Sequence, residues 1–513
     1  MRTSSRSLTP DLVLAGAVFA SRLPFVAPGA GNDNDGWFLV NAAREIAATG
    51  RYTTSRFPGY PVQEWLASLI ARAGGGPVAM NVLSALATAA CAFAFARLLR
   101  ALGARDAVLA ALALVCIPAA YVASVSAMDY LFALAFLLGA SHARVQGRTL
   151  AAGVLLGLAI GTRLTSAALL PALLLLSPPR PERERARDAA VLVCAALLLG
   201  ALCYLPAYGR YGWGFLRFVD PMGTGSSPFD FITGLIHLER LPFPPALIAG
   251  QATALLWGVP GSIVLALAFL AGAFQRGRPL PRAAGTALAA APPARAYEFA
   301  PARVRLAAGV AVCIEVVLYL RLPHDEGYLL PAVPFVLLLA AAAAPRLWFR
   351  AACVACCVSP FVLGVDLVPP KKGIASEVRS PYGWRAQAGA YALVLDVLRG
   401  PLVQDHDKRV RAAAVVARVI AARDTLPAGT LLLAGVLCAE LTDRLPQDRA
   451  HPWYTDYLLE PEVRAAVAEG RTVLLLPGAR QRTQHQAGYD PVATGAREWF
   501  VMVDSKTNAS GPP

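Results

Sequence analysis

The sequence has little charge for its length. Only 16% of its 513 residues are charged, while 56% are hydrophobic and the mean hydropathy is +0.51. A soluble domain carries about a quarter charged residues, so the deficit excludes an ordinary soluble globular protein. Apolar runs of roughly 20 residues recur along the chain, which is the length that a helix needs to cross a bilayer. The sequence therefore predicts a polytopic α-helical membrane protein.

The positions of the cysteines exclude two kinds of structural site. Only Cys438 of the nine cysteines lies clearly outside an apolar run. The group Cys353, Cys356 and Cys357 lies within such a run, where small packing residues are expected. This distribution excludes a disulfide framework and a regularly spaced zinc site. No internal repeat of about 20 to 50 residues is visible either.

Acidic residues are scarce, and the net charge of +14 comes almost wholly from arginine. Many arginines stand in short loops between apolar runs, which is the pattern of cytoplasmic loops. Contacts with anionic lipid headgroups or a lipid phosphate account for others. The basic charge therefore predicts a membrane partner and no nucleic acid.

The first apolar run, residues 11–27, follows Arg2 and Arg6. These basic residues predict a cytoplasmic amino terminus and a retained first crossing. A signal peptide with a poor cleavage region at Ala27–Ala30 is the alternative. Both interpretations place the following loop outside, so we expect a multi-pass protein of the plasma (inner) membrane.

About 11 transmembrane helices are predicted from the apolar runs. The stretch 149–176 lies between arginine-rich flanks that both look cytoplasmic, so it must cross an even number of times. Two short helices with Arg163 near their outer turn satisfy this parity. One long tilted helix is the alternative, and it would reverse every later segment. The predicted crossings are 11–27, 77–97, 107–122, 126–142, two within 149–176, 189–206, one within 246–274, 306–320, 329–344 and 351–368.

The composition changes after residue 370, where charged and polar residues return. We therefore divide the chain into a transmembrane domain at 1–370 and a C-terminal soluble α/β domain at 371–513. The odd number of crossings places the second domain in the extracytoplasmic space, although Lys371 and Lys372 count mildly against this side. Its expected strands are 430–438, 472–476 and 499–503, and its expected helices are 408–422 and 461–469.

A polar loop at residues 32–61 is the main functional candidate. It contains Asp33 and Asp35, and charge near hydrocarbon is costly and tends to mark function. Two amphipathic helices, at 37–47 and after Pro61, are expected to lie at the membrane interface. A solvated loop tip is the alternative interpretation, because Asp, Asn and Gly are common in turns.

Three further features fall on the predicted outer face, namely Asp129, Arg163 and the segment with Arg321 and His324. A reaction at a lipid-linked phosphate needs a carboxylate to accept the proton of an attacking hydroxyl, and cations to hold the phosphate. Simpler roles exist for each residue. Asp129 could cap a helix, Arg163 could reach the interface, and His324 could be a surface residue.

The sequence resembles the GT-C glycosyltransferases, the polytopic enzymes that use polyprenyl-phosphate sugars, including the protein mannosyltransferase and aminoarabinose transferase types. The resemblance covers about residues 10–370 and depends on the order of its motifs. The matching stretches are Asp35-Gly36-Trp37-Phe38, residues 42–46, Gly50-Arg51-Tyr52, Arg56-Phe57-Pro58-Gly59-Tyr60-Pro61, Ala127-Met128-Asp129, residues 157–165 and residues 321–334.

This resemblance implies that Asp35 is the catalytic carboxylate, with Asp33 as second choice, and that Asp129 assists in acceptor or metal binding. It also implies a substrate-binding set, which is Arg56, Tyr60, Arg163, Arg321, His324, Glu326 and Tyr328. The family often has Asp-Glu where this chain has Asp-Gly, which counts against an acidic-pair metal site and leaves a divalent metal ion open. The inserted residues 322–327 likewise weaken the match at Arg321.

The function implied is an inverting glycosyltransferase that moves a hexose or pentose from a polyprenyl-phosphate sugar donor to a lipid, glycan or protein acceptor. A transporter or flippase for lipid-linked sugars is the first alternative, but it should carry mid-membrane charges and related halves. Glu315 is the only convincing mid-span carboxylate. A non-catalytic membrane assembly protein is the second alternative, and it would tolerate the loss of Asp35.

Overall fold

The structure is a computed structural model, and it describes most of residues 8–499. The segments outside the description are 33, 105, 179, 217–244, 277–301, 321–325, 369–382, 389–390, 446–452, 457, 478 and 480–488.

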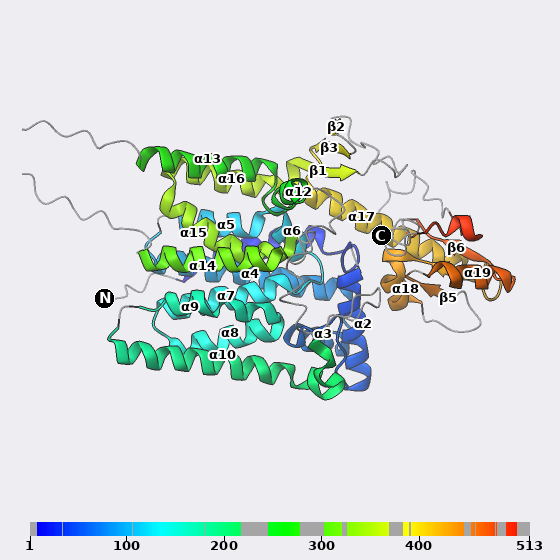
Figure 1. Ribbon diagram of the computed structural model, residues 1–513, viewed down its shortest axis with the longest axis horizontal. Coiled ribbons are helices and arrows are strands. Elements are labelled where there is room, and N and C mark those ends of the chain that lie inside the picture. Colours follow the sequence, from blue (N-terminus) through cyan, green and yellow to red (C-terminus); the bar gives the residue numbers. More distant parts are fainter. Residues whose placement is uncertain are drawn as a thin grey trace, which may run out of the picture.

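Helices lying side by side form the larger part of the molecule (Figure 1). Their apolar sequences bury a continuous core that includes Phe95, Leu114 and Leu131. These helices are α1 (Thr9–Arg22), α4 (Pro77–Ala101), α5 (Ala107–Cys116), α6 (Pro118–Ser124), α7 (Tyr130–Val145), α8 (Thr149–Thr162), α9 (Leu170–Leu175), α10 (Glu182–Tyr211), α12 (Pro245–Trp257), α13 (Val259–Arg276), α14 (Ala302–Tyr319), α15 (Val333–Ala343) and α16 (Arg346–Val362). Short 3-10 turns join or extend them, namely η1 (Leu23–Phe25), η2 (Leu164–Leu169), η3 (Gly212–Leu216) and η5 (Glu326–Ala332).

Small residues let α8 and α10 approach closely. A Cβ atom added at Gly153, Gly157 or Gly161 would lie 2.7, 2.7 or 2.5 Å from a side chain of α10. Because these glycines recur every four residues, they lie on one face of α8 and allow close helix packing, as is common in membranes. The stripe ends two residues before Arg163, so this packing fixes the position of that arginine.

The predicted number of crossings is not confirmed. Among the described residues, three helical stretches are long and apolar enough to span a membrane, Pro77–Ala101, Glu182–Leu216 and Glu326–Ala343. A fourth is possible if α5 and α6 count as one span, but they meet at a bend of 70°. The remaining apolar helices are short or interrupted, as at Arg163, where the chain turns between α8 and η2.

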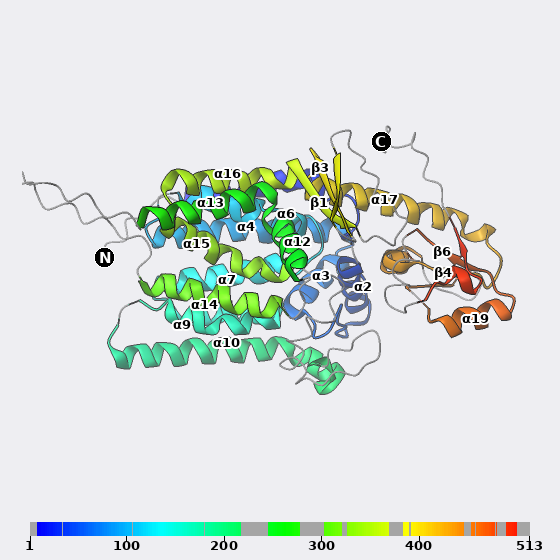
Figure 2. The same cartoon turned by 45° about the horizontal axis from the view of Figure 1, so that its top comes forward.

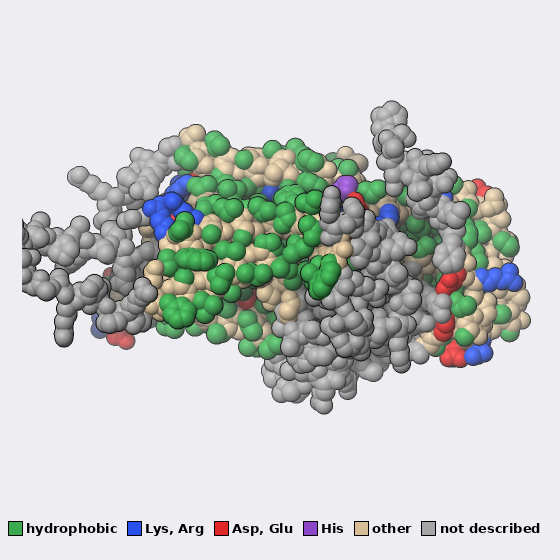
Figure 3. All heavy atoms as spheres, turned by 90° about the horizontal axis from the view of Figure 1, so that it is seen from above, with side chains coloured by type: hydrophobic (Ala, Val, Ile, Leu, Met, Phe, Trp, Pro, Cys, Tyr) green, Lys and Arg blue, Asp and Glu red, His purple; other side chains and the backbone are tan. Residues whose placement is uncertain are grey.

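The outer surface of the helical part is hydrophobic. Figure 3 shows hydrophobic side chains spread across one broad face. On α13 and α16, Leu270, Phe274, Leu347 and Val354 are all more than half exposed. Contiguous exposed apolar surface on this scale marks a membrane-facing region, which agrees with a membrane protein.

Two helices cross the end of the helical part that faces the C-terminal region (Figures 1 and 2). They are α2 (Asn34–Thr49) and α3 (Pro61–Arg72), and they match the amphipathic helices expected from the sequence. Trp37, Val40 and Ile46 are the buried side of α2. The loop between the two helices carries Arg56 and Tyr60.

The C-terminal region contains two small sheets. The first is antiparallel with the order β1-β3-β2, and the second is parallel with the order β5-β4-β6-β7. The last predicted crossing, 351–368, is shorter than expected, because α16 ends at Val362 and a strand follows. The elements are β1 (Leu363–Val368), β2 (Gly383–Ala388), β3 (Tyr391–Val397), α17 (Pro401–Ala422), η6 (Arg423–Thr425), β4 (Leu431–Leu433), η7 (Gly435–Leu437), α18 (Cys438–Arg444), β5 (Trp453–Thr455), α19 (Glu460–Ala468), β6 (Val473–Leu475), η8 (Val492–Thr494) and β7 (Arg497–Glu498).

Helix α18 packs on α2. Arg44 forms an ion pair of 2.7 Å with Asp443, and the Asn41 side chain donates a hydrogen bond of 3.1 Å to the Ala439 carbonyl oxygen. The predicted strand at 430–438 is therefore shorter than expected, because its second half turns into η7 and α18. The C-terminal region thus touches the helix that begins with the Asp35 segment.

Candidate active site

Two carboxylates and two guanidinium groups alternate in a connected chain at one end of the helical part. Asp35 forms an ion pair with Arg56, which also reaches Asp129 at 3.0 Å. The other oxygen of Asp129 lies 2.6 Å from Arg163. We call Asp35, Arg56, Asp129 and Arg163 the charged tetrad. Its members come from the start of α2, the α2–α3 loop, the residue before α7, and the turn after α8.

Exposure differs sharply along the tetrad. The side chains of Asp129 and Arg163 are 0% and 7% exposed, whereas those of Arg56 and Asp35 are 22% and 32% exposed. A buried charge is tolerated when its counter-charges and hydrogen bonds are complete, as they are for Asp129. Asp35 is therefore the carboxylate of the tetrad that a substrate can reach, and Asp129 is the buried link between the two arginines.

Arg56 remains charged at the site. Burial disfavours its guanidinium, but Tyr60, Asp35 and Asp129 together raise its pKa well above the ordinary value. Its guanidinium carbon lies 4.7 Å from the centre of the Tyr60 ring. Burial also raises the pKa of Tyr60, so this hydroxyl stays protonated and can donate a hydrogen bond. The loop thus offers a cation and a phenol side by side, which suits a phosphate oxygen.

Aromatic rings also hold Arg163. Its guanidinium carbon lies 4.2 Å from the Tyr130 ring centre and 4.4 Å from that of Tyr328. The two rings meet edge to face at 6.4 Å. Cation–π contacts of this kind fix the plane of a guanidinium while leaving its N–H groups free to donate. Tyr328 comes from η5, so the late motif of the sequence joins the site through Arg163.

A close backbone contact brings Asp35 and Asp129 together. The Ala127 N–H donates a hydrogen bond of 2.7 Å to the Ala30 carbonyl oxygen. A Cβ atom at Gly36 would lie 2.5 Å from that same oxygen. Glycine is therefore required beside Asp35, and the Asp-Gly pair has a steric reason. A glutamate at this position would push the two loops apart.

Glu64 organises the loop that carries Arg56, and the sequence analysis missed it. Its buried carboxylate accepts hydrogen bonds from the Ser55 N–H at 2.6 Å, the Ser55 hydroxyl at 2.7 Å and the Tyr60 N–H at 3.0 Å. The Tyr52 hydroxyl is a fourth donor. Burial raises the pKa of Glu64, and these four donors oppose the rise. An acidic residue among the apolar positions that follow Pro61 was the available signal.

Gly59 lies at a position of this loop that only glycine can occupy without strain. Its φ is +102°, and a Cβ there would lie 2.6 Å from the Tyr52 hydroxyl oxygen. The Tyr204 hydroxyl of α10 donates a hydrogen bond of 3.0 Å to the Gly59 carbonyl oxygen. The position needs both the left-handed backbone and the missing side chain.

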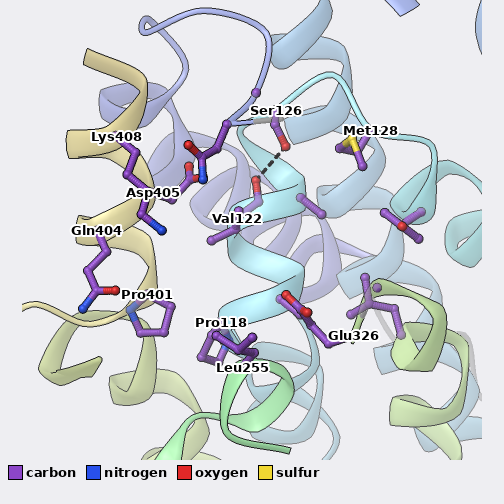
Figure 4. A pocket seen from close by; sticks show the side chains of 17 residues that line it. Pro118, Val122, Ser126, Met128, Leu255, Glu326, Pro401, Gln404, Asp405 and Lys408 are labelled. Atoms are coloured by element: carbon purple, nitrogen blue, oxygen red, sulfur yellow. Dashed lines mark hydrogen bonds between the residues drawn. The ribbon is translucent and has the colours of Figure 1, made fainter. Parts of the chain in front are cut away.

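A cavity of about 290 Å³ opens beside the tetrad (Figure 4). Tyr130, which contacts Arg163, is part of its lining, and α6 and α17 form opposite walls. Its full lining is Gly31, Asn32, Pro118, Ala119, Val122, Ala123, Ser126, Met128, Tyr130, Leu255, Glu326, Gly327, Leu330, Pro401, Gln404, Asp405 and Lys408.

One protein-family model matches part of the chain. Residues 60–293 match the model of Glycosyltransferase family 87, a range that contains Tyr60, Asp129 and Arg163. This match agrees with the glycosyltransferase part of the resemblance described above. The comparison with curated proteins finds no match.

Two solved structures are similar along most of the chain. Both are ArnT from Cupriavidus metallidurans. The structure bound to undecaprenyl phosphate is 16% identical, with a TM-score of 0.34, and the match covers 96% of this chain and 89% of that one. The apo structure is 16% identical, with a TM-score of 0.33, and covers 95% and 87%.

Most of the residues that the GT-C resemblance pointed to lie together. Asp35, Arg56, Asp129 and Arg163 form the tetrad, Tyr60 and Tyr328 contact its arginines, and Glu326 lines the cavity. Asp33, Arg321 and His324 lie outside the described residues. Within the described part of the chain, no group of three His, Cys, Asp or Glu side chains is placed to hold a metal ion. The counter-charges of the described carboxylates at the site are arginines.

Proposed function

We propose that this protein transfers a sugar from a polyprenyl phosphate to a hydroxyl of a lipid, glycan or protein acceptor, with inversion at the sugar carbon. The observation that carries the proposal is the pairing of one exposed carboxylate, Asp35, with guanidinium groups of Arg56 and Arg163 that are fixed by Asp129. Carboxylate and guanidinium are the two groups that this reaction needs.

The reaction is a single displacement. The acceptor oxygen attacks the anomeric carbon, the bond from that carbon to the phosphate oxygen breaks, and the polyprenyl phosphate leaves with the bonding electrons. Asp35 takes the proton of the acceptor hydroxyl and later releases it to water. Arg56 and Arg163 stabilise the negative charge that grows on the departing phosphate, and Asp129 is a positioning residue that keeps both arginines in place.

The site is proposed to face the extracytoplasmic side. Arginine-rich segments favour the cytoplasmic side, and the start of α10, with Arg183, Arg185 and Arg187, lies at the end of the bundle away from α2 and α3 (Figure 1). The site would then lie on the outer side, together with the C-terminal region that packs on α2. The bundle would carry the polyprenyl chain along its apolar surface.

The test is sugar transfer in membranes from radiolabelled polyprenyl-phosphate hexoses and pentoses. Asp35→Asn should abolish transfer while the protein still folds and enters the membrane, because Arg56 keeps its second partner, Asp129. Asp106→Asn is the matched control, since Asp106 pairs with Arg346 and Arg350 away from the tetrad. Transfer by the Asp35→Asn protein at the wild-type rate would remove Asp35 from the catalytic role.

A further inference from the structure

The cavity beside the tetrad has a different chemistry from the tetrad itself. It has two carboxylates, Glu326 and Asp405, and one described cation, Lys408. Anionic phosphates are recognised where positive charge is in excess. This lining has no such excess, because Asp405 pairs with Arg409 and one cation, Lys408, remains for Glu326. The cavity therefore does not suit a second phosphate, and suits an uncharged ligand that carries hydroxyl groups.

Asp405 is the key residue of the wall that α17 forms. Its side chain is 9% exposed, and its Oδ2 has no hydrogen-bond partner. The nearest guanidinium nitrogen, Nη1 of Arg409, lies 3.6 Å away, which is beyond hydrogen-bond reach. A buried acceptor without a donor is destabilising. A ligand hydroxyl in the cavity would supply the missing donor.

Arg409 connects α17 to the loop that precedes Asp35. Its Nε donates a hydrogen bond of 2.6 Å to the Pro28 carbonyl oxygen, and its Nη2 donates one of 3.0 Å to that of Gly29. These contacts occupy the guanidinium, so Arg409 pairs with Asp405 by charge at 3.6 Å and leaves its Oδ2 without a hydrogen bond. They also fix α17 against the segment that leads through Asn32 to Asp35, so the cavity and the reacting carboxylate keep one geometry.

The opposite wall is apolar. Pro118 and Val122 of α6 face the α17 side chains Gln404, Asp405 and Lys408 across the cavity (Figure 4). A volume of about 290 Å³ is at the low end of small-molecule sites, so it has room for one small headgroup. Polar groups on one wall and carbon surface on the other fit a sugar ring, which has hydroxyls at its edge and C–H groups on its faces.

We propose that this cavity is the acceptor site and that it takes the neutral sugar headgroup of a glycan or glycolipid, with Asp405 accepting a hydrogen bond from a ring hydroxyl. The inference rests on the proposed function, because it takes the cavity ligand to be the acceptor whose hydroxyl Asp35 deprotonates. It assigns acceptor choice to α17, in the C-terminal region, and donor binding to the arginines of the tetrad.

Binding is measured first, without any donor, on the full-length protein in lipid nanodiscs. The probes are methyl hexosides and methyl pentosides, with methyl phosphate as the charged comparison, and the readout is saturation-transfer NMR. Wild-type protein should bind at least one methyl glycoside more strongly than methyl phosphate. Asp405→Asn should weaken that binding about tenfold or more, the loss expected for one buried charged hydrogen bond.

The matched control is Asp407→Asn, on the same helix. The Asp407 side chain pairs with Arg399 and does not line the cavity, so this variant should bind like the wild type. Gln404→Ala is the second variant, in case Asp405→Asn does not fold, and it should also weaken binding. Equal binding by the wild type and both cavity variants, or preference for methyl phosphate, would overturn the proposal.

A transfer assay then separates the two proposals. In the Asp405→Asn protein, the acceptor KM should rise about tenfold or more, while the donor KM stays unchanged. A rise in donor KM instead would contradict the acceptor assignment. If the wild type binds a glycoside through Asp405 but transfers no sugar, the proposed reaction fails while the binding site stands.

Discussion

The strongest single prediction concerns Glu64, which does not belong to the tetrad. The change is Glu64→Gln, which keeps the shape of the side chain but replaces one acceptor oxygen with an NH₂ group. Four donors, two from Ser55, one from Tyr60 and one from Tyr52, converge on the two carboxylate oxygens. In either orientation of the amide, its NH₂ group faces one backbone N–H, which cannot accept a hydrogen bond, and one hydroxyl, which can turn to accept one.

The size of the effect follows from burial. A buried polar group left without its partner costs about 1 to 3 kcal/mol, and this is the cost expected for the one backbone N–H that the amide leaves unpaired. A free energy of about 2 kcal/mol already corresponds to a roughly 30-fold change in an equilibrium. The loop from Ser55 to Tyr60 would therefore leave its present conformation, and Arg56 would leave its place between Asp35 and Asp129.

The assay is steady-state sugar transfer with the donor varied. We expect the donor KM of Glu64→Gln to rise about tenfold or more, because Arg56 and Tyr60 are on the disturbed loop. The value of kcat should fall as well, because Arg56 stabilises the charge that grows on the departing phosphate. Thermal unfolding in detergent should begin at a lower temperature.

Glu45→Gln is the matched control, because Glu45 is an exposed glutamate on α2. It should leave both the donor KM and the unfolding temperature unchanged. A Glu64→Gln protein with a wild-type donor KM and a wild-type unfolding temperature would refute the reasoning that Glu64 positions Arg56.

Two further predictions concern the contacts around α2. Gly36→Ala should strongly reduce transfer and lower the unfolding temperature, because its Cβ would lie 2.5 Å from the Ala30 carbonyl oxygen; transfer and melting assays check this. The second concerns pH. Burial raises the pKa of Glu440 from 4.5 to about 7. The charge of Arg444 opposes this rise, and the charge of Asp443 adds a smaller increase. The folded state therefore holds more protons than the unfolded state between these values, and stability falls as pH rises from 4.5 to 7, by up to about 3 kcal/mol. Melting of Glu440→Gln should depend less on pH in this window.

The predictions for Gly36 and Glu440 each have a matched control variant. Gly50→Ala should be milder for transfer, because a Cβ at Gly50 meets no atom within 4 Å, although its φ of +68° is strained for alanine. Full transfer by Gly36→Ala would contradict the close contact of the two loops. For the pH prediction, the control is Glu469→Gln, an exposed acid at the end of α19. A pH profile of Glu440→Gln equal to that of the wild type would show that Glu440 does not titrate on unfolding.

The tetrad combines partly exposed charged side chains with buried ones. Asp129 contributes no surface of its own, yet it touches both arginines, so its part is to fix their positions. Asp35 and Arg56 are the accessible end. Because the buried Asp129 pairs with both guanidinium groups, the two arginines are held in one arrangement beside the apolar bundle. Asp35 has the largest exposed fraction of the four side chains, 32%.

The sequence by itself determined the helical character of the chain, the amphipathic helices α2 and α3, and the break at Arg163. Hydropathy and periodicity report how each segment is buried, and these are local properties. Hydropathy and periodicity are less informative about where each helix ends. The count of eleven crossings was therefore not confirmed, and the segment after Val362 is a strand. The residue types of the site were also visible, through the GT-C resemblance.

Only the tertiary structure decided which of these residues meet. Arg56 and Asp129 are 73 positions apart in the chain, and Asp129 and Arg163 are 34 apart. Their pairing depends on how four segments dock, through the Gly36 contact and the glycine stripe of α8, and no local pattern reports such docking. The role of Glu64 and the cavity wall from α17 were hidden for the same reason: a side chain acquires its partners only when segments distant in sequence are packed together.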